Sequence, residues 1–122
     1  MVWTLDARVP IVIVADAEAL EAALAAGPSA AVLAEAPPLP MPAGAAALAS
    51  FDPVMPHLAG CGCCGGRPPA AAALDRLFQA RVRGACPWFD RVVAHVETPE
   101  AREAVALALR DDAVTAARFR PA

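Results

Sequence analysis

The sequence predicts a small α/β protein, a three-layer sandwich with a short and mainly parallel sheet of about three strands. Two observations predict this fold class. Short runs rich in valine, isoleucine and alanine, without polar alternation, are typical of strands covered on both faces. Between these runs lie segments with leucine and valine at helical spacing, each of which begins with a capping residue or a proline. Strands and helices that alternate along a chain are typical of parallel sheets with right-handed crossovers.

The first strand and the first helix follow each other directly. Residues 9–14 form a β-branched run that predicts a buried strand. Asp16 is expected to be the N-cap of a helix over residues 17–26, because its carboxylate can accept from the free amides of the first turn. Leu20 and Leu24, four residues apart, give this helix its apolar side.

The next part of the chain is less regular. Residues 29–35 predict a second, weaker strand. Residues 36–44 are rich in proline, which lacks an amide donor, so we expect an irregular loop there. Residues 45–55 fit neither a strand nor a helix clearly.

The second half contains two helices around one strand. A helix is expected to begin at Pro68 or Pro69 and to end near Gly84. Residues 88–96 predict the third strand, and Thr98 is the expected N-cap of a last helix. We expect three residues on the apolar side of that last helix: Val105, Leu107 and Leu109.

Composition limits the possible functions. The 122 residues fit a single domain, and 58% hydrophobic against 19% charged residues is typical of a folded chain. A net charge of -3 argues against binding to nucleic acid. All ten cations are arginines, which excludes chemistry that needs a lysine amine. No apolar run approaches the roughly 20 residues that a membrane span needs, so we expect neither a signal peptide nor an anchor.

Three of the four cysteines gather in a glycine-rich loop at residues 57–67. Cys61, Cys63 and Cys64 combine a Cys-x-Cys with a Cys-x-x-Cys spacing, and the four glycines around them allow a tight turn. Such a turn can direct several thiolates at one ion, and thiolates select zinc or copper(I). Clustered thiols cannot staple distant segments, so a reducing cytoplasm is the expected compartment.

A closed tetrahedral site needs a fourth donor, which the sequence does not decide. The candidates are His57, Cys86 and His95, besides water or a partner molecule. We favour an open site, which leaves this position to water or a partner, and place His57 with the candidate ligands. We expect Cys86 to belong to the core and His95 to be a hydrogen-bonded core residue. The cysteine cluster is also compatible with redox chemistry between its thiols, and with burial of each cysteine as a small apolar residue.

The chain resembles the CobW-like metallochaperone GTPases, a P-loop family. The resemblance covers residues 30–122, and 9–26 more loosely, through the order and spacing of four segments: Gly60-Cys61-Gly62-Cys63-Cys64, Leu74-Asp75-Arg76-Leu77, Phe89-Asp90-Arg91-Val92-Val93 and the tail 112–120. In that family a Gly-Cys-x-Cys-Cys segment binds a metal ion, commonly zinc. The resemblance therefore implies metal ligation by Cys61, Cys63 and Cys64, on a reduced P-loop-NTPase-like scaffold.

The departures from the family concern the nucleotide. The family has a glycine-rich loop ending in Gly-Lys-Ser/Thr after its first strand, whereas this chain has Ala15-Asp16-Ala17-Glu18, whose carboxylates would repel a phosphate. Of the Asn-Glu-Phe-Gly segment only Glu35 is retained. Residues 95–98 replace the family's Glu-Thr-Thr/Ser-Gly, and the guanine-specificity motif has no counterpart up to Ala122. We therefore expect no nucleotide and no GTPase activity.

Two functions from different classes follow. The first is a non-catalytic, CobW-like metal-binding protein that holds or passes on zinc through residues 60–64. The alternative is a structural or interaction subunit that has kept the scaffold, in which an exposed sheet edge and the proline-rich loop dock onto a larger protein or a second copy. Its cysteines would then be remnants or redox-active.

Overall fold

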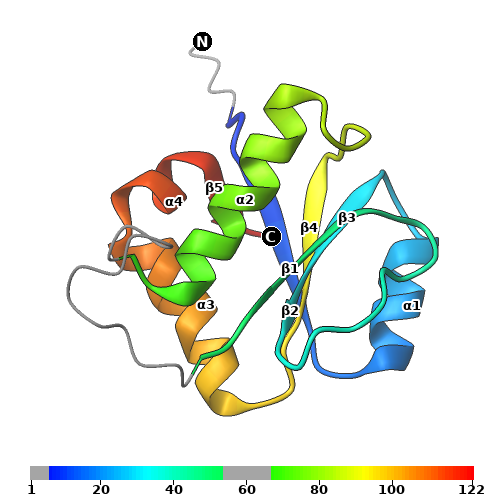
Figure 1. The fold of residues 1–122 in the computed structure, drawn as a ribbon, viewed down its shortest axis with the longest axis horizontal. Coiled ribbons are helices and arrows are strands. Elements are labelled where there is room, and N and C mark those ends of the chain that lie inside the picture. Colours follow the sequence, from blue (N-terminus) through cyan, green and yellow to red (C-terminus); the bar gives the residue numbers. More distant parts are fainter. Residues whose placement is uncertain (1–5, 54–66) are drawn as a thin grey trace, which may run out of the picture.

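A computed structural model describes residues 6–53 and 67–122 and shows an α/β fold built on a five-stranded, all-parallel sheet (Figure 1). The sheet order is β3-β2-β4-β1-β5. Its strands are β1 (Val9–Val14), β2 (Ala30–Glu35), β3 (Ala45–Phe51), β4 (Arg91–His95) and β5 (Phe119–Pro121). The expectation of a mainly parallel sheet is confirmed, but the expected number of about three strands is too low.

The two additional strands lie at the edges of the sheet, where sequence signals are weakest. β3 falls in the segment that fitted neither element, because its sequence AAALASF holds no β-branched residue. It pairs with β2, from Ala30↔Ala45 to Glu35↔Phe51. β5 has three residues and pairs with β1 within the tail segment.

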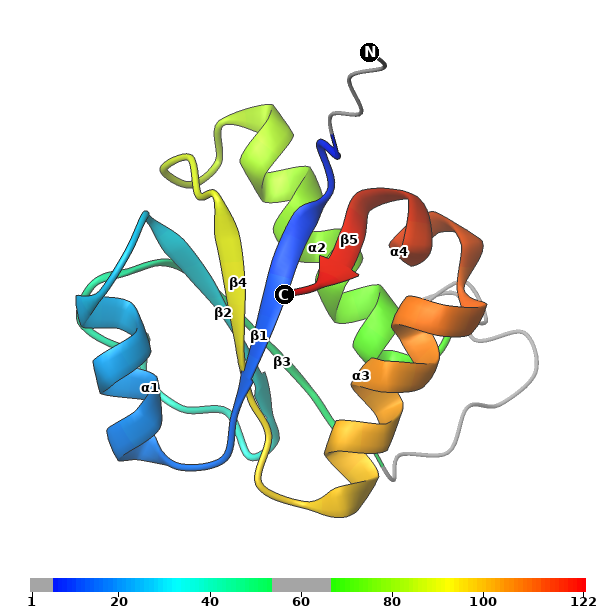
Figure 2. The same cartoon turned by 180° about the vertical axis from the view of Figure 1, so that it is seen from behind.

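Helices cover both faces of the sheet unequally. The helices are α1 (Ala17–Ala25), α2 (Pro69–Arg83), α3 (Pro99–Asp111) and α4 (Ala113–Arg118). Among the helices of the described residues, α1 lies on one face, and the other three gather on the opposite face (Figure 2). None of the helices in residues 6–53 and 67–122 has the length and apolar character that a membrane crossing requires.

Capping explains where the predicted helices begin and end. The Asp16 carboxylate accepts from the backbone N–H of Ala19 at 2.7 Å, and the Thr98 hydroxyl accepts from that of Ala101 at 3.2 Å. α2 ends at Gly84, whose φ of 71° is left-handed and therefore favours glycine. These three boundaries are confirmed within one residue of the expected positions.

Two clusters of buried side chains lie on the two sides of the sheet. The larger cluster packs α2 and α3 against the sheet and includes Leu33, Leu74 and Val92, each fully buried. The smaller cluster packs α1 through Leu20 against Val32 and Val93. Successive strand residues thus point to opposite layers, which is why the strands read as continuous apolar runs.

Two details of the expected strand and helix in the second half are wrong. The third predicted strand begins at Arg91 and not at residue 88, and Trp88 is 57% exposed. On α3, Val105 is fully buried as expected, but Leu107 is exposed. Positions 105 and 107 differ by about 200° around a helix, so they cannot share one face.

The connections after β2 and β4 leave in opposite directions along the sheet. β2 continues through residues 36–44, without a helix, to its outer neighbour β3. β4 continues through α3 and α4 to β5 on the far side of β1. The carboxyl ends of β2 and β4 therefore form a topological switch point, the place where open parallel sheets generally bind ligands.

Candidate functional site

The metal ligands predicted from the sequence lie outside the described residues. Cys61, Cys63, Cys64 and His57 all belong to residues 54–66. The structure describes the chain on both sides of them, at the end of β3 and at the start of α2. The predicted metal site therefore lies between two flanks that the structure describes.

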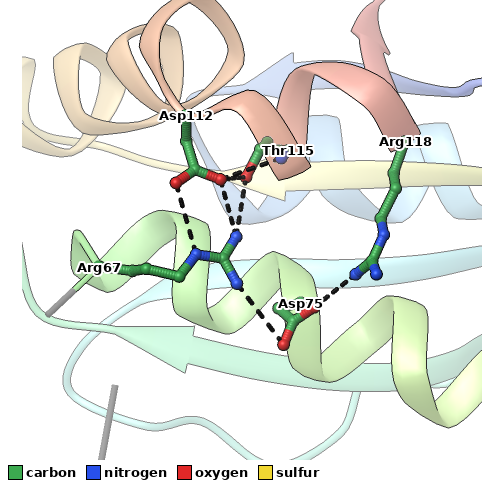
Figure 3. A network of polar contacts seen from close by, with 5 residues as sticks. All are labelled: Arg67, Asp75, Asp112, Thr115 and Arg118. Atoms are coloured by element: carbon green, nitrogen blue, oxygen red, sulfur yellow. Dashed lines mark hydrogen bonds and ion pairs between the residues drawn. The ribbon is translucent and has the colours of Figure 1, made fainter. Parts of the chain in front are cut away.

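Both flanks are attached to the folded body. At the first, the carbonyl of Phe51, which is 4% exposed, accepts from the backbone N–H of Ala36 at 2.7 Å. At the second, the Arg67 guanidinium donates to the Asp112 carboxylate, with Nη2 2.7 Å from Oδ2, and lies 3.6 Å from Asp75 (Figure 3). The cysteine-bearing segment thus starts from the sheet and returns to the helical layer.

The Arg67 contact belongs to a network that joins three helices (Figure 3). Asp112 lies between α3 and α4 and caps α4, accepting from the backbone N–H and the hydroxyl of Thr115 at 2.9 and 2.8 Å. Arg118 of α4 donates to Asp75 of α2 at 2.5 Å. The hydrogen bond from Arg67 lowers the pKa of Asp112 from 3.8 to about 2, despite the opposing effect of burial.

The turn between β1 and α1 holds no phosphate-binding loop. Ala15 and Asp16 alone connect the two elements. The Asp16 carboxylate binds the Ala19 amide, an N–H of the kind that would face a phosphate at a helix N-terminus. The Asp16 carboxylate thus takes the place at the start of α1 that a phosphate would occupy.

A pocket of about 320 Å³ opens at the switch point between β2 and β4. From the β2 side it is lined by Glu35 and by the first part of the proline-rich loop, and from the β4 side by the strand's last residue and the start of α3. The lining residues are Glu35, Ala36, Pro37, Leu39, His95, Glu97 and Thr98.

Glu35 links the two sides of this pocket. Its carboxylate accepts from the backbone N–H groups of Glu97 and Thr98, the latter at 2.9 Å, and from the Thr98 hydroxyl at 2.9 Å. Burial opposes its ionisation, but these hydrogen bonds and the nearby His95 together lower the pKa of Glu35. Glu35 therefore acts as the anion at the N-terminus of α3.

His95 is buried as expected, but the expected hydrogen bond is missing at its Nε2 atom in the described part of the chain. Its side chain is 8% exposed, and within the described part of the chain its Nε2 atom has no hydrogen-bond partner. Glu97 Oε1 lies 3.7 Å from Nε2, beyond hydrogen-bonding distance. A buried, unpaired imidazole nitrogen is costly and marks the pocket as a candidate ligand site.

The remaining candidate for the fourth ligand lies at the other end of the sheet. Cys86 follows α2 and precedes β4, so it lies towards the amino ends of the parallel strands. The cysteine-bearing segment follows β3, at the carboxyl ends of the strands (Figure 1). Cys86 packs against the larger cluster, which agrees with its expected place in the core. In residues 6–53 and 67–122 no three histidine, cysteine or acidic side chains lie close enough together to hold a metal ion.

The sequence patterns assign no role to this pocket. Glu35, Glu97 and Thr98 stand at positions that the sequence comparison aligns with motifs of the CobW-like GTPases. No local pattern predicts that they meet, because 62 residues separate Glu35 from Glu97. One signal is present, since Glu35, His95 and Glu97 are polar residues at the ends of buried apolar runs. Parallel pairing brings the carboxyl ends of such strands to the same end of the sheet.

Comparisons with known proteins add no relative. No protein-family model matches the chain, no curated protein matches it, and no solved structure matches it.

Proposed function

We propose that this chain is a non-catalytic, CobW-like metal-binding protein that holds or passes on zinc through Cys61, Cys63 and Cys64, with His57 as the fourth ligand. The observation that carries the proposal is the presence of three thiols within four residues, between flanks that are fixed at both ends. Fixed flanks reduce the entropy that a loop loses when it closes around an ion. Thiolates favour zinc or copper(I) over hard cations.

The helix start after β1 supports a role without nucleotide. Asp16 supplies the carboxylate that caps α1, and a second acidic residue, Glu18, follows in the first turn. A phosphate group placed there would meet two negative charges and would find the Ala19 amide already bound. The scaffold therefore suits a binding protein better than a GTPase.

Cobalt(II) and zinc binding to the reduced protein test this proposal. We expect one equivalent of zinc by elemental analysis, and with cobalt(II) the near-ultraviolet absorption of thiolate-metal charge transfer. Replacing Cys61, Cys63 and Cys64 together with serine should abolish both signals. Cys86→Ser is the matched control and should retain both, because Cys86 is partly buried against the larger cluster at the opposite end of the strands. Reduced protein that takes up neither zinc nor copper(I) would refute the proposal.

The same assay identifies the fourth ligand. His57→Gln should weaken zinc binding by about tenfold or more, as expected for the loss of one ligand, whereas His95→Gln should change it little. If His95→Gln alone has the larger effect, the fourth ligand comes from the end of β4.

The alternative function, a structural or interaction subunit, is favoured by a different observation. Leu39 and Met41 of the proline-rich loop are 48% and 57% exposed. Exposed apolar side chains on a loop suit docking onto another protein or a second copy. Light scattering after gel filtration separates the two functions: a monomer that binds zinc supports the first, and a chain without zinc that self-associates supports the second.

A further inference from the structure

The pocket at the switch point is a candidate ligand site that does not depend on the cysteines. Seven residues of the described part of the chain line it. At about 320 Å³ it is at the small end of the range for ligand pockets, which suits a compact molecule. Its position at the carboxyl ends of diverging strands is the one where parallel sheets commonly bind ligands.

The charges of the pocket select against anions. The start of α3 would normally attract an anion, but the Glu35 carboxylate already accepts from the N–H groups of Glu97 and Thr98. Glu97 adds a second carboxylate, which is 62% exposed. The lining of the pocket in the described ranges includes no arginine. The pocket therefore favours a ligand with a positive charge.

Two polar atoms of the lining residues lie close together: His95 Nε2, which is buried and has no hydrogen-bond partner in the described part of the chain, and Glu97 Oε1. His95 Nε2 and Glu97 Oε1 are 3.7 Å apart, too far to bond directly. A neutral imidazole with its proton on Nδ1 presents an acceptor at Nε2, and the Glu97 carboxylate is an acceptor as well. A primary ammonium group has three N–H donors and can satisfy both atoms at once.

A metal ion fits the same atoms less well. Within residues 6–53 and 67–122 no three candidate ligand side chains come together, and zinc sites use three or four protein ligands. Both oxygens of Glu35, the remaining candidate, accept hydrogen bonds from Glu97 and Thr98. Two acceptors suffice for an ammonium group.

The rest of the lining suits an aliphatic chain attached to that group. Ala36, Pro37 and Leu39 supply an apolar wall, and Leu39 is 48% exposed at its edge. We propose that the pocket between β2 and β4 binds a small aliphatic primary amine. Its ammonium group contacts His95 Nε2 and Glu97 once the exposed Glu97 carboxylate has turned away from the buried Nε2 atom, and its hydrocarbon chain lies along Leu39. This inference goes beyond metal binding.

The imidazole of His95 provides the readout. The chain has two histidines, so His57→Gln leaves His95 as the one imidazole seen by nitrogen-correlated NMR. The protein is titrated without metal, at pH 8 in an amine-free buffer, where an alkylamine is protonated. n-Butylammonium should shift the His95 signals saturably and bind roughly tenfold more tightly than methylammonium, because of its three additional methylenes. Leu39→Ser should reduce that difference.

Matched variants and ligands decide the outcome. Glu97→Gln should weaken n-butylammonium about tenfold, whereas Glu100→Gln, which removes a carboxylate from the first turn of α3 outside the lining, should leave it within twofold. Tetramethylammonium, which lacks N–H donors, should have no effect. Four results would each overturn the proposal. They are equal losses in the two variants, an equal response to tetramethylammonium, acetate or phosphate, stoichiometric zinc binding at His95, and no shift of the His95 signals with any amine. The titration is repeated with Cys61, Cys63 and Cys64 changed to serine. Amine binding is thereby tested independently of the proposed metal site.

Discussion

Arg67 and Asp112, 45 residues apart, are joined by two hydrogen bonds, from Nε to Oδ1 at 3.4 Å and from Nη2 to Oδ2 at 2.7 Å. The pair fixes the end of the cysteine-bearing segment to the junction of α3 and α4 (Figure 3). Asp112 is also the N-cap of α4, so one carboxylate stabilises both a helix start and a long-range contact. Its side chain is 15% exposed, which limits screening by solvent.

Removing the Asp112 carboxylate should destabilise the protein. Asp112→Ala removes a helix cap and the acceptor for Arg67, and we expect a loss of about 2 kcal/mol in the free energy of unfolding, measured with urea. Arg67→Met should cost less alone, and the two changes together less than their sum, because they share a contact. Asp111→Ala is the control: its pair with Arg110 is more than 60% exposed on both sides, and we expect under about 0.5 kcal/mol. Equal losses for Asp111→Ala and Asp112→Ala would contradict this account.

The same carboxylate should make stability depend on pH. The pKa of Asp112 is about 2 in the folded protein and 3.8 as its ordinary value. Because the folded pKa is the lower one, the stabilisation is complete above about pH 4 and is lost as the pH falls towards 2. We expect the difference in unfolding free energy between the native protein and Asp112→Asn to shrink over that range. A difference that stays constant from pH 5 to pH 2 would mean that the native carboxylate is not held ionised by Arg67.

Replacing Glu35 should change the charge preference of the pocket. Glu35→Ala leaves the N–H groups of Glu97 and Thr98 without their acceptor. We expect a loss of about 2 kcal/mol in the free energy of unfolding, as for hydrogen bonds to a charged group. Inorganic phosphate should then raise the melting temperature of the variant but not of the native protein, because an anion can take the vacated place at the start of α3. Glu21→Ala on the exposed side of α1 is the control and should show neither effect. The same response to phosphate in all three proteins would contradict the role of Glu35 as the anion at the start of α3.

Gly84 should be sensitive to substitution for reasons of backbone conformation alone. Its φ is +71°, and an added Cβ would meet no atom within 4 Å. Gly84→Ala should therefore cost about 1 kcal/mol through the left-handed conformation rather than through a clash. Gly84→Asn should cost less, since asparagine tolerates this conformation better. Thermal or urea unfolding measures both, and an alanine variant as stable as the native protein would show that the helix ends differently in solution.

Local signals made much of the fold predictable. The caps Asp16 and Thr98 and the terminal Gly84 act on their own helices, within a few residues of sequence. The buried strands β1, β2 and β4 were recognisable from continuous apolar runs. Such features depend on neighbours in the chain, and sequence patterns record them directly.

The features that escaped prediction depend on distant partners. β3 is an alanine-rich strand whose conformation is set by pairing with β2, and β5 is three residues held by β1. The contact between Glu35 and Thr98 spans 63 residues, and that between Arg67 and Asp112 spans 45. The sheet order brings these residues together, and no local pattern specifies it. The cysteine ligands remain a prediction, since they lie outside the described residues.

The unequal covering of the sheet has a consequence for how the protein opens. α1 buries only Leu20, whereas α2 buries its first turns against the larger cluster. Arg91 of β4 partly compensates by donating to the carbonyls of Ala23 and Ala26 at the end of α1. Native-state hydrogen exchange should therefore release the amides of α1 at a lower free energy than those of α2. The molecule has a fast-exchanging layer and a slow-exchanging layer, divided by the sheet.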